Sequence, residues 1–157
     1  MQLKRDTDYA IRILLVMAEP TLNKKELQRL DLKSICEKTS VPRAIALRLC
    51  NLLSDAGFLK KEETDGNTIY MPENDLSEKT VLDIIDAVEG QSNLFAVFDR
   101  RAEIYTKYGL ALASVNAALS AELNKITLQT ILDWEQQKQI PSHNAFLDEY
   151  EMGPLNR

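Results

Sequence analysis

Two arginines in the segment that begins at Pro42 have the type and spacing for contact with a nucleic acid. Arg43 and Arg48 lie five residues apart, and no acidic residue occurs from Lys38 to Ser54. An arginine ends in a planar fork that can donate two hydrogen bonds to atoms O6 and N7 of a guanine. A carboxylate on the same surface would repel phosphates, so its absence favours DNA contact over an ordinary solvated helix face.

These arginines need a helix that presents them outward. Pro42 suits the first turn of a helix, and Gly57 suits the left-handed position just beyond its end. Apolar residues between them recur at the spacing of one buried stripe, at Ala46, Leu49, Cys50 and Leu53. The remaining outer face consists of Arg43, Ala44, Leu47 and Arg48. We expect the two arginines to bind DNA, with Ala44 either against a thymine methyl group or simply allowing close approach. Leu47 is more typical of a packing residue.

The flanking elements predict a winged helix-turn-helix. Hydrophobic periodicity and capping residues predict three helices, over residues 6–18, 33–37 and 42–55. Residues 21–31 are interpreted as a polar connector. Two strands follow, over residues 58–63 and 68–71, and Asp65-Gly66 is a hairpin turn signal between them. Three helices and then a β-hairpin form the layout of a winged helix-turn-helix, in which the second helix of the pair enters the major groove.

Other basic residues are positioned to bind backbone phosphates. Lys4 precedes the first helix, and Lys60 and Lys61 begin the wing. Phosphate contacts position a protein without reading sequence. Neighbouring residues on a strand face opposite sides, so we expect only one of the two wing lysines to point at DNA. The rest of the wing is acidic, at Glu62, Glu63 and Asp65. This acidity argues against deep insertion into the minor groove.

Charge is divided unevenly along the chain. The 157 residues carry a net charge of −5. Residues 1–61 contain 12 lysines and arginines against 7 aspartates and glutamates, whereas residues 62–157 contain 7 against 17. A basic head on an acidic body suits a DNA reader whose body stays away from the phosphates, although chance also produces such asymmetry.

The second half of the chain predicts a dimerisation region. We expect a helix over residues 78–89 with Ser77 as its N-cap, a long helix over 99–124, and a last helix over 128–137 capped by Thr127. One stripe of the long helix is apolar, at Ile104, Tyr108, Ala111, Val115, Leu119 and Leu123. A small head cannot cover a stripe of this length, so we expect the same helix of a second copy to cover it.

The predicted fold class is therefore mainly α, with a winged helix-turn-helix head, a small β-hairpin wing and a long C-terminal dimerisation helix. We divide the chain into a DNA-binding domain over residues 1–75, a helical dimerisation region over 76–138, and a tail over 139–157. The expected partners are double-stranded DNA and a second copy of the chain.

Composition argues against several other classes. The apolar runs are too short to span a membrane, and charged residues interrupt any signal-peptide layout near the start, so we expect a cytoplasmic protein. Two cysteines, Cys36 and Cys50, and one histidine, His143, supply too few ligands for a zinc site. The cysteines are a redox switch or, as the buried stripe favours, small buried hydrophobes. No phosphate loop or nucleophile elbow occurs, so we expect no enzyme and no cofactor.

Four stretches, in order, resemble the Rrf2-type winged-helix regulators, a bacterial family that includes an iron–sulfur cluster regulator and a cysteine-metabolism repressor. They are MQLKRDTDYA at 1–10, LKSI with SVPR at 32–35 and 40–43, VLDIIDAVEG at 81–90, and LNKITL at 123–128. The resemblance covers about residues 1–135. It implies transcription control, by repression in our interpretation, through a homodimer whose two heads bind a palindromic operator.

The chain departs from this family where some members bind a cluster. Those members carry three closely spaced cysteines between the helix after the wing and the dimer helix, whereas residues 91–101 here contain none. Thiolates hold iron–sulfur clusters, so the resemblance implies the cluster-free branch. Apolar residues replace them, at Leu94, Phe95, Val97 and Phe98. They form either a pocket for a small-molecule effector or plain core.

A second interpretation remains open at this point. Many relatives have a glycine-rich wing, but the wing here has one glycine, Gly66, and is acidic. The chain is then a winged-helix interaction module that binds a protein, such as a metabolic enzyme, rather than DNA. The same protein partner can also act as an effector of a DNA-binding dimer.

Overall fold

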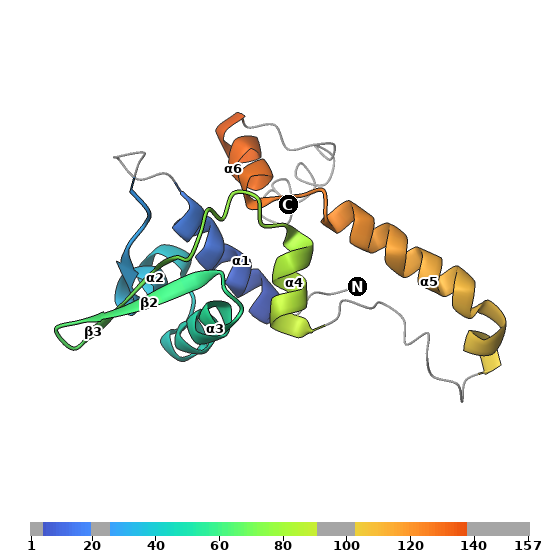
Figure 1. Ribbon diagram of the computed structural model, residues 1–157, viewed down its shortest axis with the longest axis horizontal. Coiled ribbons are helices and arrows are strands. Elements are labelled where there is room, and N and C mark those ends of the chain that lie inside the picture. Colours follow the sequence, from blue (N-terminus) through green and yellow to red (C-terminus); the bar gives the residue numbers. More distant parts are fainter. Residues whose placement is uncertain (1–4, 20–25, 91–102, 138–157) are drawn as a thin grey trace, which may run out of the picture.

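The computed structural model describes residues 5–19, 26–90 and 103–137 (Figure 1). In chain order its elements are α1 (Arg5–Ala18), β1 (Leu30–Asp31), α2 (Leu32–Thr39), α3 (Arg43–Asp55), β2 (Leu59–Thr64), β3 (Asn67–Pro72), α4 (Val81–Glu89), α5 (Glu103–Leu123) and α6 (Leu128–Gln137). The predicted fold class, a mainly α winged helix-turn-helix with a long helix after it, is confirmed.

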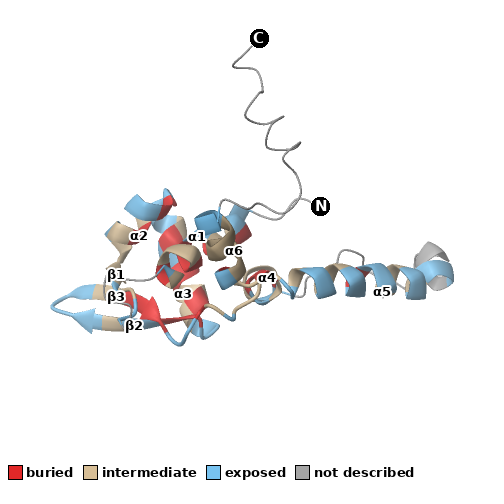
Figure 2. Ribbon diagram, turned by 90° about the horizontal axis from the view of Figure 1, so that it is seen from above, coloured by how far each residue is buried: buried red, intermediate tan, exposed pale blue. Residues whose placement is uncertain are grey.

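α1 is the central helix of the head, by which we mean α1 to α3 with the sheet. It packs against α2, α3, α4 and α6, because apolar residues cover most of its circumference. Its fully buried face supplies Ala10, Ile13, Leu14 and Met17 to one hydrophobic core. Ile84 of α4 and Leu128 of α6 join the same core. Figure 2 shows the buried residues gathered mainly in α1 and α3 and in the part of the sheet beside them.

The turn between α2 and α3 is fixed by polar contacts. Asp31 caps α2, where its carboxylate accepts a hydrogen bond from the Ser34 N–H at 2.8 Å. At the other end Ser40 adopts a left-handed conformation, with φ 57°, and its N–H donates to the carbonyl of Cys36. The Thr39 hydroxyl donates to the carbonyl of Ile35 at 2.6 Å. These contacts set the direction in which α3 leaves the turn.

The wing belongs to a three-stranded antiparallel sheet with the order β1-β3-β2. Asp65 and Gly66 form the two-residue turn of the hairpin, with φ 50° and 80°, as the sequence predicted for Asp-Gly. The sequence analysis missed β1, which lies in the segment interpreted as a connector. β1 contains two residues, and Leu30 pairs with Tyr70. A strand this short has no period from which to recognise it.

The prediction that Ser77 caps α4 is wrong. Thr80 is the N-cap: its hydroxyl accepts from the Asp83 N–H at 3.1 Å, and the Asp83 carboxylate accepts from the Thr80 N–H at 2.9 Å. This reciprocal box needs an acidic residue three positions after the cap. Thr80 has one and Ser77 does not, so α4 begins later than predicted. The Ser77 N–H instead donates to Asp75.

The start of α4 is also joined to the start of α6. Thr80 and Thr127 form an isolated antiparallel bridge. The Val81 N–H donates to the carbonyl of Ile126 at 2.8 Å, and the Leu128 N–H donates to the carbonyl of Lys79 at 2.9 Å. Thr127 caps α6 as predicted, because its hydroxyl accepts from the Thr130 N–H at 3.0 Å.

α5 extends away from the head (Figure 1). Its C-terminal end lies beside α4, and its N-terminal end points outward. Figure 2 colours most of this helix as exposed. None of the described helices combines the length and apolar character that crossing a bilayer requires.

Candidate nucleic-acid interface

The outer face of α3 consists of the residues that the sequence analysis assigned to it. Arg43, Ala44, Leu47 and Arg48 are exposed. The opposite stripe is fully buried, at Ala46, Leu49, Cys50 and Leu53. The helix keeps this orientation because its buried stripe faces α1 and α2. Contact between the outer face and DNA remains a prediction.

The first turn of α3 leaves backbone N–H groups open. Its N-cap is Pro42, which makes no side-chain capping hydrogen bond. The first helical bond runs from the Ala46 N–H to the carbonyl of Pro42 at 2.9 Å. Uncapped N–H groups and the helix dipole give a helix N-terminus partial positive charge, which attracts phosphate. Arg43 adds a full charge at the same place, so this end of α3 suits an anionic ligand.

A groove separates this end of α3 from the wing. Its volume is about 390 Å³, and it is lined by Asp31, Leu32, Lys33, Arg43, Leu47, Gly66, Asn67, Thr68 and Tyr70. Two of these side chains are basic and come from different helices, Lys33 from α2 and Arg43 from α3. The sequence analysis missed Lys33. Its position in the first turn of α2 was the available signal, because that turn lies next to α3 in a helix-turn-helix.

The two predicted reading arginines differ in their surroundings. Arg48 donates from Nη2 to Asp6 Oδ2 of α1 at 2.8 Å. Arg43 forms no ion pair with any residue that the structure describes. Arg43 is therefore free to reach a phosphate or a base, whereas Arg48 is already held at one nitrogen.

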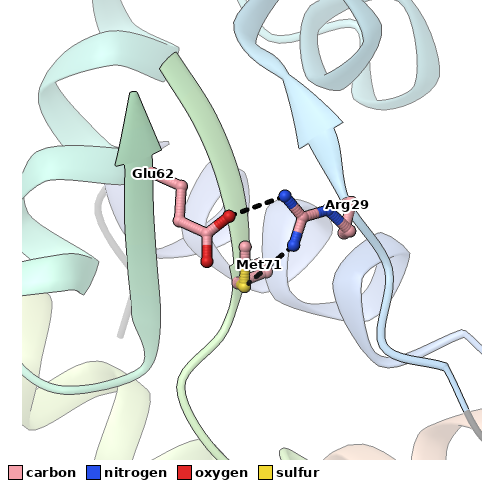
Figure 3. A network of polar contacts seen from close by, with 3 residues as sticks. All are labelled: Arg29, Glu62 and Met71. Atoms are coloured by element: carbon pink, nitrogen blue, oxygen red, sulfur yellow. Dashed lines mark hydrogen bonds and ion pairs between the residues drawn. The ribbon is translucent and has the colours of Figure 1, made fainter. Parts of the chain in front are cut away.

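The acidic wing is partly neutralised from outside the hairpin. Arg29, just before β1, donates to Glu62 at 2.6 Å and lies 3.8 Å from the sulfur of Met71 (Figure 3). Glu63 and Asp65 remain exposed. The sequence analysis missed Arg29 because its partner is 33 positions away. The negative charge of the wing is therefore concentrated at its tip.

The two wing lysines lie on opposite faces of β2. Lys61 donates to the side-chain oxygen of Asn51 on α3 at 3.1 Å, which places it on the helix side. Lys60 pairs in register with Met71, on the side of Arg29. Lys61 is thus the wing lysine next to α3. Lys4, the third predicted phosphate ligand, lies outside the described residues.

The predicted dimer stripe is largely exposed. Tyr108, Ala111 and Val115 are exposed, and Leu119 and Leu123 are half-buried. The side chain of Ile104 lies outside the described part of the chain. Leu110, which the sequence analysis did not include, is 89% exposed. The predicted effector residues Leu94, Phe95, Val97 and Phe98 also lie outside the described residues.

The cysteine of α3 is suited to packing. Cys50 is fully buried. Burial, with a smaller contribution from the nearby Cys36, raises the pKa of the Cys50 thiol to about 12. The thiol therefore stays protonated at neutral pH, whereas redox reactions and metal binding require the thiolate.

Comparison with known families assigns the chain. The sequence profile of the Rrf2 family, described as an iron-dependent transcriptional regulator, matches residues 3–133. The chain belongs to the Rrf2 family. It is therefore a winged-helix, DNA-binding transcriptional regulator, and its family consists of transcription factors rather than enzymes. No curated protein sequence matches it.

Several solved structures share the fold. The cysteine regulator CymR (YrzC) of B. subtilis superposes with a TM-score of 0.66 at 20% identity, over 85% of this chain and 98% of that one. A putative transcriptional regulator from Listeria innocua gives 0.68 at 19%, over 92% of each chain. IscR of T. potens gives 0.65 at 17%, over 93% of this chain and 96% of that one.

The family description names iron, but the donors of this chain do not fit an iron–sulfur cluster. Both cysteines lie in the head, on α2 and α3, and residues 91–102 contain none. Cys50 is held as the thiol, and clusters are bound by thiolates. Within residues 5–19, 26–90 and 103–137, no three potential metal ligands come together. We therefore assign no iron-dependent step to this Rrf2 protein.

Proposed function

We propose that this Rrf2 protein is a bacterial, cytoplasmic repressor that binds a palindromic operator as a homodimer, with α3 of each copy in a major groove. The outer face of α3 is the observation that carries the proposal. It presents Arg43, Ala44 and Arg48 to solvent beside a groove that also contains Lys33. Phosphates bind the uncapped first turn, and the arginines donate to base edges.

The charges around this face support DNA as the ligand. No acidic residue occurs on α3 before Asp55, near its far end. Glu62 on the wing is paired with Arg29, so the positive charge of Arg29 partly offsets the repulsion between Glu62 and a phosphate. Lys61 lies on the α3 side of β2, where it can bind the backbone of the same duplex.

The exposed side chains of α5 support the homodimer. Tyr108 and Val115, on the predicted stripe, are large apolar residues that the described head does not cover. Soluble proteins seldom leave such a surface open to water. A second α5 presents the same stripe and can cover it by twofold symmetry, which also produces two copies of α3 for a palindrome.

Selection of bound fragments from the source genome, followed by fluorescence anisotropy, tests the proposal. The purified full-length protein should enrich a palindromic site, and its affinity should fall steeply as salt rises. Arg43→Ala should weaken the site by about 1–3 kcal/mol. Lys125→Ala, at an exposed lysine in the turn after α5, is the control and should have little effect. Absence of any enriched site would contradict the proposal.

A protein partner is the second candidate, and the exposed tip of the wing favours it. Glu63 and Asp65 would attract a basic surface rather than a phosphate. Affinity capture with the full chain and with a Glu63→Gln, Asp65→Asn double variant tests this function. Retention of a metabolic enzyme by the native protein, but not by the double variant, would support this function. Capture of nothing, together with operator binding, would remove it.

A further inference from the structure

An exposed ion pair joins the predicted reading helix to the first turn of α1. Arg48 and Asp6 are 42 positions apart, and the packing of α1 against α3 brings them within 2.8 Å. Their side chains remain 54% and 35% exposed. Surface ion pairs of this kind contribute little to folding stability. A role in stability therefore does not account for a carboxylate placed against this arginine.

The pair restricts the guanidinium of Arg48. A free arginine side chain samples many rotamers and loses that freedom when it binds. Asp6 accepts a hydrogen bond from Nη2, which leaves the rest of the planar fork available to a ligand. A guanidinium that is already held in one direction loses less conformational entropy when it binds a base. It also discriminates better against a base whose acceptor atoms lie elsewhere.

The carboxylate of Asp6 also changes which part of DNA is attractive. Phosphate oxygens are negative and are repelled by Asp6, whereas O6 and N7 of guanine are neutral acceptors. Arg43, which has no such neighbour in the described structure, keeps its full attraction for phosphates. The two arginines are therefore not equivalent.

We propose that Asp6 is a positioning residue that determines DNA specificity by directing the Arg48 guanidinium toward a base edge and away from phosphate. This inference rests on the proposed DNA-binding function. It adds a residue of α1, outside the helix-turn-helix, to the set that selects the operator.

The simpler role for Asp6 is interaction with the dipole of α1, since acidic residues stabilise the first turn of a helix. Asp8 provides a matched control for that role. It lies in the same first turn. Its side chain is 52% exposed, and its carboxylate pairs with Arg12 at 2.7 Å, one turn along α1 and not on α3. Asp6→Asn and Asp8→Asn change the net charge equally, and each removes a carboxylate from the first turn of α1.

The experiment measures discrimination with full-length protein. Fluorescence anisotropy gives the affinity for the selected genomic site and for a scrambled duplex of equal length, each over a salt series. Asp6→Asn should lower the ratio of the two affinities by about five- to tenfold, part of the discrimination of one arginine–guanine pair. Much of the change should come from tighter binding of the scrambled duplex. Asp8→Asn should change the ratio less than about twofold.

Arg48→Ala completes the cycle. In that background Asp6→Asn should have no further effect on the ratio, because the residue acts through Arg48. Asp6→Glu keeps the carboxylate and should restore part of the discrimination. Thermal unfolding checks that each variant is folded. If Asp6→Asn does not fold, Asp6→Ser carries the test, because it removes the carboxylate and keeps a polar residue in the first turn; an unchanged ratio of the two affinities in it overturns the inference.

The remaining outcomes separate this inference from the proposed function. Equal effects of Asp6→Asn and Asp8→Asn on the ratio would assign both to charge or helix dipole and overturn the inference. Equal tightening of both duplexes by Asp6→Asn would show that Asp6 only screens charge, and would also overturn it. A native protein that selects no site removes the proposed function itself.

Discussion

The head and α5 differ in how their apolar residues are covered. In the head, α1 and α3 bury complete stripes, and residues such as Ile13 and Leu49 have no exposed surface. On α5, Leu110 is almost fully exposed, and Tyr108 and Val115 are also open to water. With α4 and α6, the head completes its core within one chain, whereas α5 presents an apolar surface that the proposed dimer would cover. If the proposed dimer forms, one sequence contains residues that specify folding and residues that specify assembly.

A charged substitution on α5 should have the largest expected effect, and it should act on the stability of the proposed dimer. Val115→Glu puts an unpaired carboxylate into the proposed dimer interface, which should cost about 3 kcal/mol or more, roughly a hundredfold in the dimer dissociation constant. Analytical ultracentrifugation measures it. Leu27→Glu is the matched control, since Leu27 is an exposed leucine of the head. An equally stable dimer with Val115→Glu would mean that this stripe of α5 is not the interface.

A cavity in the head should act on folding rather than on assembly. Leu49→Ala removes a fully buried side chain of α3 and should lower the free energy of unfolding by about 2–5 kcal/mol. Leu47→Ala, two residues away on the exposed face, should lower it by less than about 0.5 kcal/mol. Urea unfolding at one fixed protein concentration measures both. Similar losses in the two variants would contradict the orientation of α3.

The cap of α4 should have a moderate effect on the same quantity. Thr80→Ala removes one half of the capping box and should cost about 1 kcal/mol of unfolding free energy. Ser77→Ala, at the position that the sequence pattern favoured, should cost little, because its side chain is not the cap. The two variants are compared by urea unfolding. The reverse order of effects would restore Ser77 as the cap.

The cap of α2 should give the smallest effect, seen only in acid. Hydrogen bonds from Ser34 lower the pKa of Asp31 below its ordinary value of 3.8. The carboxylate therefore stabilises the head above about pH 4, and this contribution is lost as the pH falls through the lowered pKa. Asp31→Asn should flatten the dependence of the melting temperature on pH in that range. Asp65→Asn, in the exposed wing turn, should leave it unchanged.

Local signals explain what the sequence predicted well. Pro42, Gly57 and a buried stripe of period 3.6 bound α3 and define its outer face, so the sequence alone predicts that its arginines are exposed. Asp65-Gly66 similarly defines the hairpin. Each signal lies within the element that it specifies, which is why a single sequence is sufficient.

The missed features depend on partners that are distant in the chain. β1 exists because Leu30 pairs with Tyr70, and Arg48 is held by a residue of α1. Neither contact leaves a local pattern. The cap of α4 is a different kind of error, because two hydroxyl residues lie close together and only Thr80 has Asp83 at the spacing of a capping box. The DNA contacts and the dimer remain predictions of the sequence that the described residues accommodate.

The bridge between Thr80 and Thr127 has a consequence for the geometry of an operator. It joins the segment that directly follows α5 to the start of α4, at the point where α6 also begins. Two copies joined along α5 would hold their two α3 helices at a fixed separation and in a fixed relative orientation. Such a molecule measures distance along the duplex: a single base pair inserted between the two halves of its site would turn one half away by about a tenth of a helical turn.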